Sequence, residues 1–205
     1  MLVQGVESQT IKRSMKKLIL LTAFIFTAFL TTDSVKAQDG FFSNARTLEK
    51  GVGSVALQPV FLTNQDDFMF IIRGGYGLTN SVTGHLKLGL FEDETFFGGH
   101  FETALNNSAE SNIDVAALVG VHSYGDLGLK LGLNLSTDLD AVSIYSGINY
   151  QPLFIENNTN HAILVPIGFD VHLNEGFDIM LEGNIPANDD ARYLEAITFG
   201  TRFYF

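Results

Sequence analysis

Hydrophobic and polar positions alternate along most of this chain, from Gly51 to Phe205. The clearest run covers residues 127–135, where every odd position is leucine and the even positions hold glycine, lysine or asparagine. A helix would spread these leucines around its circumference, whereas a β-strand places all of them on one face. Residues 113–121 and 177–181 repeat the pattern. The main element predicted is therefore a two-faced β-strand.

Short polar clusters with turn chemistry separate these runs, for example at residues 79–81, 124–126 and 174–176. The pattern predicts ten strands, at about residues 51–62, 67–78, 81–91, 95–105, 112–123, 126–136, 141–153, 160–173, 176–185 and 192–205. Residues 138–165 can be divided in more than one way, so eight or twelve strands stay open. No helix is predicted after residue 37. The simplest fold is all-β, an antiparallel up-and-down barrel, because closure removes exposed strand edges.

The first 37 residues have the pattern of a short leader followed by a secretion signal. Lys16 and Lys17 precede a largely apolar run of 13 residues, Leu18–Leu30, and Val35-Lys36-Ala37 forms a cleavage site before Gln38. That run is too short to span a bilayer as a helix, which takes about 20 residues. Either Met1 or Met15 is the start, and an uncleaved membrane anchor is the alternative. Residues 38–50 are predicted to be a short periplasmic segment, followed by the barrel at 51–205.

The chain is acidic, and removing the signal makes it more so. Its 205 residues include 12 Lys+Arg and 23 Asp+Glu, a net charge of −11. Cleavage after Ala37 removes five basic and two acidic residues, which leaves 7 and 21 and a net charge of −14. This balance argues against a nucleic-acid partner, whose phosphates need basic residues. The absence of cysteine excludes disulfides, thiolate metal sites, cysteine nucleophiles and a lipoprotein anchor.

The two faces of the predicted strands differ in a way that favours lipid on the apolar side. In the apolar register, the middle of each strand carries no Asp, Glu, Lys or Arg, and Glu195 is the one charged exception, near a strand end. A basic residue on a lipid face costs about 2–4 kcal/mol at the midplane. The opposite face combines charged residues with many glycines, which weaken strands but make room inside a narrow barrel. The apolar face is therefore predicted to point outward.

The opposite face is predicted to line the lumen with a polar network. Its members are Arg73, His85, Lys87, His100, Glu102, Asp114, His122, Lys130, Tyr145, Asn149, Asp170, His172, Asp178, Glu182 and Arg202. Opposite charges should pair there, because an unpaired buried charge is costly, and Asp178–Arg202 and Lys87–Glu102 are predicted partners. The four lumen histidines lie on four different strands, so the sequence places no two at ligand spacing. They are predicted to be hydrogen-bonding fillers, with no metal or cofactor.

The last strand carries a further signal. Ile197, Phe199, Phe203 and Phe205 alternate to the final residue, with Thr201 as a weaker match. Here the sequence resembles the bacterial outer-membrane β-barrel family over about residues 51–205, without pointing to a subfamily. The resemblance implies a transmembrane barrel of a Gram-negative-type bacterium, with its last strand recognised by the barrel-insertion machinery. It also implies both termini in the periplasm, turns near Asn80, Ser108, Asp138 and Glu175 on that side, and outer-membrane lipid or membrane proteins as partners.

No catalytic site is predicted. Omptin-like proteases resemble this chain in strand count, but they are far longer and use Asp/His pairs near extended outer loops. The predicted outer loops, near Gln65, Asp93, Gly125, Asn157 and Asn188, are short and contain no histidine except His161 at a strand edge. His122 and Ser123 are adjacent in one strand, so their side chains point to opposite faces. The sequence therefore predicts a protein without enzymatic activity.

Three functional interpretations follow from these patterns. The first is a small outer-membrane barrel with a narrow or side-chain-plugged polar lumen and a structural, accessory or interaction role. The second is a small passive, porin-like channel for ions or small solutes, since ten strands enclose slightly more space than the eight that side chains can fill. The third is a soluble secreted barrel that binds a ligand inside.

Overall fold

The computed structural model describes residues 43–90, 95–106, 112–124, 126–156 and 158–205. The predicted leader, the cleavage site after Ala37 and the loop positions Asp93, Ser108, Gly125 and Asn157 lie outside these residues. Among the residues described, no helix has the length and apolar character needed to cross a membrane.

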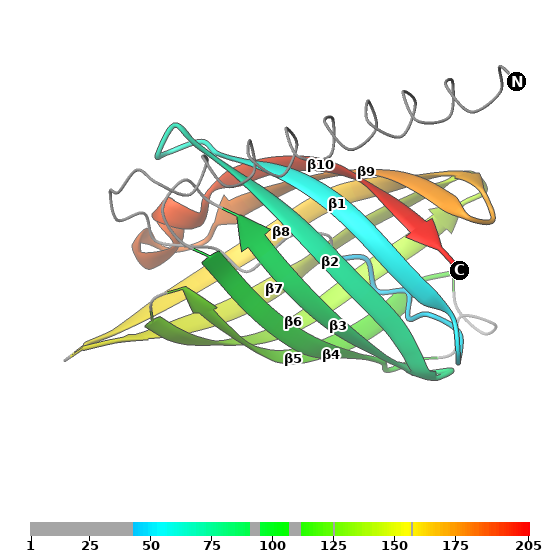
Figure 1. Ribbon diagram of the computed structural model, residues 1–205, viewed down its shortest axis with the longest axis horizontal. Coiled ribbons are helices and arrows are strands. Elements are labelled where there is room, and N and C mark those ends of the chain that lie inside the picture. Colours follow the sequence, from blue (N-terminus) through cyan, green and yellow to red (C-terminus); the bar gives the residue numbers. More distant parts are fainter. Residues whose placement is uncertain (1–42, 91–94, 107–111, 125, 157) are drawn as a thin grey trace, which may run out of the picture. The chain divides into compact units, whose positions relative to one another are not determined.

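The described residues form ten β-strands and one short 3₁₀-helix. In chain order these are β1 (Gly53–Leu62), β2 (Asp67–Thr79), β3 (Val82–Leu90), β4 (Thr95–Ala104), β5 (Asp114–Tyr124), β6 (Asp126–Leu139), β7 (Val142–Ile155), β8 (Asn158–Asn174), β9 (Phe177–Pro186), η1 (Asp189–Leu194) and β10 (Ala196–Tyr204). Each strand pairs antiparallel with its neighbours in sequence, and β1 pairs with β10 to close the barrel. Figure 1 shows β1, in cyan, beside β10, in red. The prediction of an all-β, ten-stranded up-and-down barrel is confirmed.

The barrel has two distinguishable ends. We call the end at which β1 begins and β10 finishes the inner end; the tight turns from Thr79 to Val82, from Leu139 to Val142 and from Asn174 to Phe177 lie there as well. The outer end holds the turn between β1 and β2 and the connection from β9 to β10. That connection contains η1, so the prediction of no helix after residue 37 is wrong, as is the start of the last predicted strand at residue 192.

The apolar face of each strand points away from the barrel interior. On β6, Leu131, Leu133 and Leu135 are 45–48% exposed, whereas Lys130 and Asn134, on the other face, are 4% and 1% exposed. Among the described residues, exposed Asp, Glu, Lys and Arg side chains lie in the N-terminal segment, in turns, in η1 or at strand ends. Glu195, the predicted exception on the apolar face, lies outside β10, and its carboxylate accepts a hydrogen bond from Asn64 Nδ2 at 2.7 Å.

Aromatic side chains gather on the outer surface near both ends of the strands. Phe61 and Phe68 contact each other near the outer end, with ring centroids 5.1 Å apart, and Phe177 and Phe203 do so near the inner end at 4.8 Å. Leucine, isoleucine and valine predominate in the band between them, although Phe199 lies in the middle of β10; the aliphatic residues include Leu86, Leu88, Val119, Val121, Leu131, Leu133, Ile148 and Ile179. Ile197, Phe199, Phe203 and Phe205 all lie on this outer surface, between 45% and 79% exposed.

Candidate functional site in the barrel lumen

The fifteen predicted lumen residues share the inward face of the strands, although not all of them reach the same depth. Twelve are buried, namely Arg73, His85, Lys87, His100, Glu102, His122, Lys130, Tyr145, Asn149, Asp170, Asp178 and Glu182. Asp114, His172 and Arg202, all toward the inner end, are partly exposed. Gln58, Thr83, Asn134, Ser143, Asn184 and Thr198 are buried polar residues that the prediction omitted. They occupy the same alternating positions, so the strand register was the signal that would have included them.

Arg202 is the centre of an ionic cluster near the inner end. Its Nη2 donates to Asp178 Oδ2 at 2.8 Å and to Asp170 Oδ2 at 3.0 Å, and its Nε donates to Asp178 at 3.3 Å. The Tyr204 hydroxyl also donates to Asp178. Arg202 and Asp178 stand directly opposite each other on β10 and β9, as predicted. One guanidinium thereby neutralises two carboxylates that are nearly inaccessible to water.

The predicted Lys87–Glu102 pair is not directly opposite in the sheet. The register between β3 and β4 sets Lys87 against Gly98 and Glu102 against Thr83. Strand alternation gave the correct face for both residues, but the register depends on the turn between the strands, which the pattern does not specify. This pairing stays a prediction.

Ser143, His172 and Asp178 form a hydrogen-bonded chain across β7, β8 and β9. Ser143 Oγ lies 2.7 Å from His172 Nε2, and His172 Nδ1 lies 2.8 Å from Asp178 Oδ1. The order of groups is that of serine hydrolases, and sequence reasoning did not bring them together because they are far apart along the chain. Ser143 is fully buried, however, and its hydroxyl also donates to Asp138. A substrate carbonyl cannot reach that oxygen. These hydrogen bonds therefore link the strands β7, β8 and β9 and do not form a hydrolase site.

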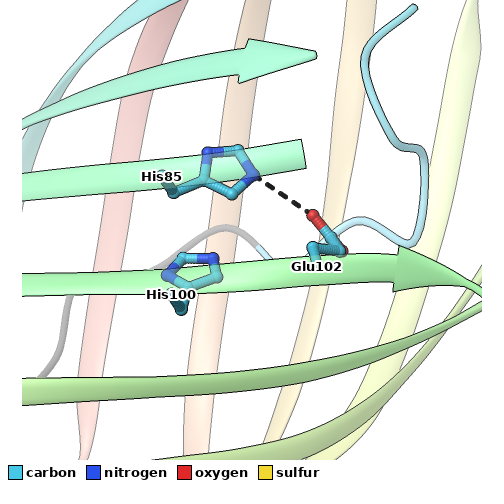
Figure 2. Close-up of side chains that lie close together, drawn as sticks. All are labelled: His85, His100 and Glu102. Atoms are coloured by element: carbon cyan, nitrogen blue, oxygen red, sulfur yellow. Dashed lines mark hydrogen bonds and ion pairs between the residues drawn. The ribbon is translucent and has the colours of Figure 1, made fainter. Parts of the chain in front are cut away.

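His85, His100 and Glu102 form a compact group in the polar part of the lumen (Figure 2). His85 on β3 is directly opposite His100 on β4, and their rings stack with centroids 4.6 Å apart. His85 Nε2 lies 3.3 Å from Glu102 Oε2. One nitrogen from each ring and a Glu102 carboxylate oxygen all lie within 4.8 Å of one another. Sequence analysis put both histidines on the lumen face but not side by side, because it did not supply the register.

The described N-terminal segment, Ser43–Lys50, enters the barrel from the inner end. Ser43, Asn44 and Ala45 are at most 5% exposed. The Ser43 backbone N–H donates to Glu182 Oε2 at 2.7 Å, and Asn44 Nδ2 donates to Asp170 Oδ2 at 2.7 Å. The sequence predicts residues 38–50 as a short periplasmic segment, and it gave no sign that Ser43 and Asn44 are bonded to lumen carboxylates.

The same segment is held against the wall nearer the inner end. The Leu48 N–H donates to the Thr83 hydroxyl at 2.7 Å, and the Gly51 N–H donates to the Gly77 carbonyl at 2.9 Å. A Cβ at Gly77 would lie 1.9 Å from the Glu49 carbonyl oxygen, so the segment can pass here only because position 77 has no side chain. The segment and the wall are therefore fitted to each other.

The outer part of the lumen is apolar. The buried side chains there include Val60, Leu62, Met69, Ile71, Phe96 and Leu153. The 3₁₀-helix η1 adds Ala191 and Leu194, which cluster with Ala162 and Leu164 of β8. Tyr193 packs against this cluster, and burial raises its pKa to about 12, so its ring stays neutral. The outer end is thus lined largely by buried apolar side chains, with His122 beside Phe96 and Gln151 opposite Ala162 as buried polar neighbours.

A small polar cavity remains between the N-terminal segment and the wall. Its volume is about 10 Å³, and its lining includes Asn44, Arg46, Gln58, His85 and Glu102. A cavity of about 10–15 Å³ holds one water molecule. The space inside this part of the lumen is therefore enough for a water or a single ion.

No protein-family model and no curated protein sequence matches this chain. Solved structures with a similar fold include the KdgM porin, at 8% identity over 74% of this chain and 99% of that one, with a TM-score of 0.47. Outer membrane protein Omp33 of Acinetobacter baumannii aligns at 11% identity over 76% and 99%, with a TM-score of 0.43. The N-terminal β-barrel domain of OprF from Pseudomonas aeruginosa aligns at 11% over 77% and 100%, with a TM-score of 0.38. At these identities and TM-scores the likenesses assign neither a family nor a role to this chain.

Proposed function

We propose that this chain is a non-enzymatic outer-membrane β-barrel of a Gram-negative-type bacterium, exported by a signal cleaved after Ala37. Its lumen is closed by its own residues, and it has a structural or accessory role in the membrane. The first strand begins at Gly53 and the last strand ends at Tyr204, both on the periplasmic side. Outer-membrane lipid surrounds the apolar band. The observation that carries the proposal is an outward apolar surface combined with a lumen that the N-terminal segment enters at the inner end and apolar side chains pack at the outer end.

The outer surface supports the membrane placement. A membrane barrel is expected to carry an apolar band flanked by aromatic side chains at both interfaces, and here phenylalanine pairs near both ends flank a mainly aliphatic band. Strands of 9 to 17 residues are long enough, since a tilted strand crosses a bilayer in about 9–11 residues. A soluble protein rarely exposes such a continuous apolar surface, because its contact with water is unfavourable.

The two closures support a sealed lumen. At the inner end, Ser43 and Asn44 occupy lumen carboxylates that would otherwise meet a passing solute. At the outer end, Leu62, Phe96 and Leu194 are at most 2% exposed, and an apolar core of this kind presents no partner to a hydrated ion. The two closures are made by different elements, so loss of one leaves the other.

Location is tested by fractionating cells and by running unheated and boiled samples on a gel. We expect the protein in the outer-membrane fraction, with a band that shifts on boiling because the folded barrel resists detergent. Recovery in the soluble periplasm without such a shift would overturn the membrane placement and favour a secreted ligand-binding barrel.

Closure is tested by recording from planar bilayers containing the purified protein. We expect no stable conductance from the full mature chain, and none from a variant lacking residues 38–46, because the outer core remains in place. A stable, porin-sized conductance of the mature chain would overturn the sealed lumen and favour the passive channel. Conductance in the deletion variant alone would show that the segment is the only closure.

A further inference from the structure

We propose that His85, His100 and Glu102 bind a divalent transition-metal ion, with Zn²⁺ as the best-fitting case, inside the lumen. The site uses side chains of two adjacent strands, β3 and β4, and it adjoins the small cavity between the wall and the N-terminal segment. It does not depend on whether the barrel lies in a membrane.

The strand register builds the site. His85 and His100 are directly opposite on antiparallel strands, which brings the side chains of such a pair close together. Glu102 follows His100 by two residues and so shares its face of the sheet. The three candidate ligand atoms lie within 4.8 Å of one another. All three residues are at most 8% exposed, so the geometry is held by the barrel wall.

The distance between His85 and Glu102 suits two ligands of one tetrahedral ion, while His100 lies within 4.8 Å of both. Zinc binds imidazole nitrogen and carboxylate oxygen at about 2.0–2.2 Å, so two ligands of one tetrahedral ion lie about 3.3–3.5 Å apart. His85 Nε2 and Glu102 Oε2 are 3.3 Å apart. Three protein ligands leave a fourth position for water, and the cavity of about 10 Å³ beside His85 and Glu102 has room for one. Two imidazoles also favour zinc-like ions over Mg²⁺ or Ca²⁺, which prefer oxygen.

A second observation concerns the ring of His100. His100 Nδ1 is buried and has no hydrogen-bond partner within the described part of the chain. Buried polar side-chain atoms are nearly always hydrogen-bonded, because burial without a partner costs about 1–3 kcal/mol. A metal ion between His85 and His100 gives the His100 ring a partner for a nitrogen lone pair.

Arg73 opposes the ion and provides a sharp test. Its Nη2 lies 3.0 Å from His85 Nε2, and its Nε donates to His85 Nδ1 at 3.2 Å. The guanidinium therefore shares a ligand atom with the proposed ion and adds a like charge beside it. Metal binding has to displace Arg73 from His85 Nε2. Removing the Arg73 guanidinium should therefore raise the affinity for the metal, whereas removing a metal ligand should lower it.

The experiment uses the full mature chain, refolded in detergent with Zn²⁺ present so that entry past the N-terminal segment is not required. After removal of free metal, we expect one Zn²⁺ per chain, and X-ray absorption of the bound zinc should show two imidazoles. His85→Ala, His100→Ala and Glu102→Gln should each lower the affinity at least tenfold in competition with a chelator. Arg73→Gln should raise it several-fold.

His161→Ala is the matched control, because His161 is exposed at the outer end and should not affect binding. Every variant is first checked for the gel shift of a folded barrel. No bound zinc in the folded wild-type chain would overturn the proposal. So would zinc that remains in the three ligand variants or is lost with His161→Ala, since that would be adventitious surface binding. The absorption measurement needs no variant, so it decides the ligand set even if a variant does not fold.

Discussion

A few inward-facing side chains form the buried ion pairs of the lumen. The side chains of Asp170 and Asp178 are almost completely buried, and both depend on the Arg202 guanidinium. Removing one partner of a buried ion pair is more damaging than the pair is stabilising, because a charge is left without compensation. Surface ion pairs lack this asymmetry, since water and salt screen them.

Arg202→Gln should therefore destabilise the barrel by about 3–5 kcal/mol. The measurement is urea unfolding of the refolded protein in detergent, followed by the fraction of gel-shifted, folded band. Arg46→Gln is the control: Arg46 pairs with Asp138 at 3.1 Å, but both side chains are exposed, so its loss should cost at most about 1 kcal/mol. Equal effects of the two substitutions would contradict the central role of Arg202.

The histidines show which features of a single residue can be predicted from the sequence and which cannot. Period-two alternation assigns His85 and His100 to the lumen, because each side chain's face depends only on its own strand. Their contact depends on the register of two strands, which is set by the turn between them. The sequence thus indicated which residues are inside, while the contact of His85 with His100 and Glu102 required the pairing of β3 with β4.

At the scale of elements, the strands were predictable and the segments that close the barrel were not. Strands repeat a simple two-residue pattern over 9 to 17 residues. The 3₁₀-helix η1 is six residues long and presents Ala191 and Leu194 on one side, a spacing of three that is too short to stand out. Residues 43–50 are held by hydrogen bonds to lumen side chains and not by burial of an apolar face. Their sequence therefore shows no apolar periodicity.

Gly77→Ala should loosen this segment without unfolding the barrel. The new methyl group would overlap the Glu49 carbonyl, which is backbone and cannot rotate away. We expect amide hydrogen exchange in residues 43–50 to rise at least tenfold, with the strands β6–β9 unchanged. Gly74→Ala is the control on the same strand, since a Cβ there meets no atom within 4 Å. Unaltered protection in Gly77→Ala would show that the segment does not depend on this contact.

At the scale of the whole barrel, the polarity is inverted relative to a soluble protein. Leucines and phenylalanines face outward, while four basic and five acidic residues of the predicted network face inward. Such an arrangement is stable only where the outer solvent is apolar. The cost of an outward charge should then depend on depth, which a soluble barrel would not show.

Leu133→Arg, in the middle of β6, should cost about 2–4 kcal/mol in phospholipid vesicles, and Leu139→Arg, at the inner end of the same strand, about 0–1 kcal/mol. Both leucines are exposed, at 48% and 56%, so in water the two substitutions would each stay within about 0.5 kcal/mol. Urea titrations of the vesicle-inserted variants measure the difference. Equal, small effects would place the barrel in water.

The pairing of β1 with β10 has a consequence for the order of assembly. β1 is synthesised first and β10 last, yet Ser54 pairs with Tyr204, and the Gly53 N–H donates to the Phe205 carbonyl at 2.8 Å. The β1–β10 pairing therefore cannot form until β10 has been synthesised. If the other strands pair before β1 pairs with β10, Ser43 and Asn44 can reach Glu182 and Asp170 from the side, without being threaded through a finished pore. Pairing of β1 with β10 would then enclose the N-terminal segment within the barrel.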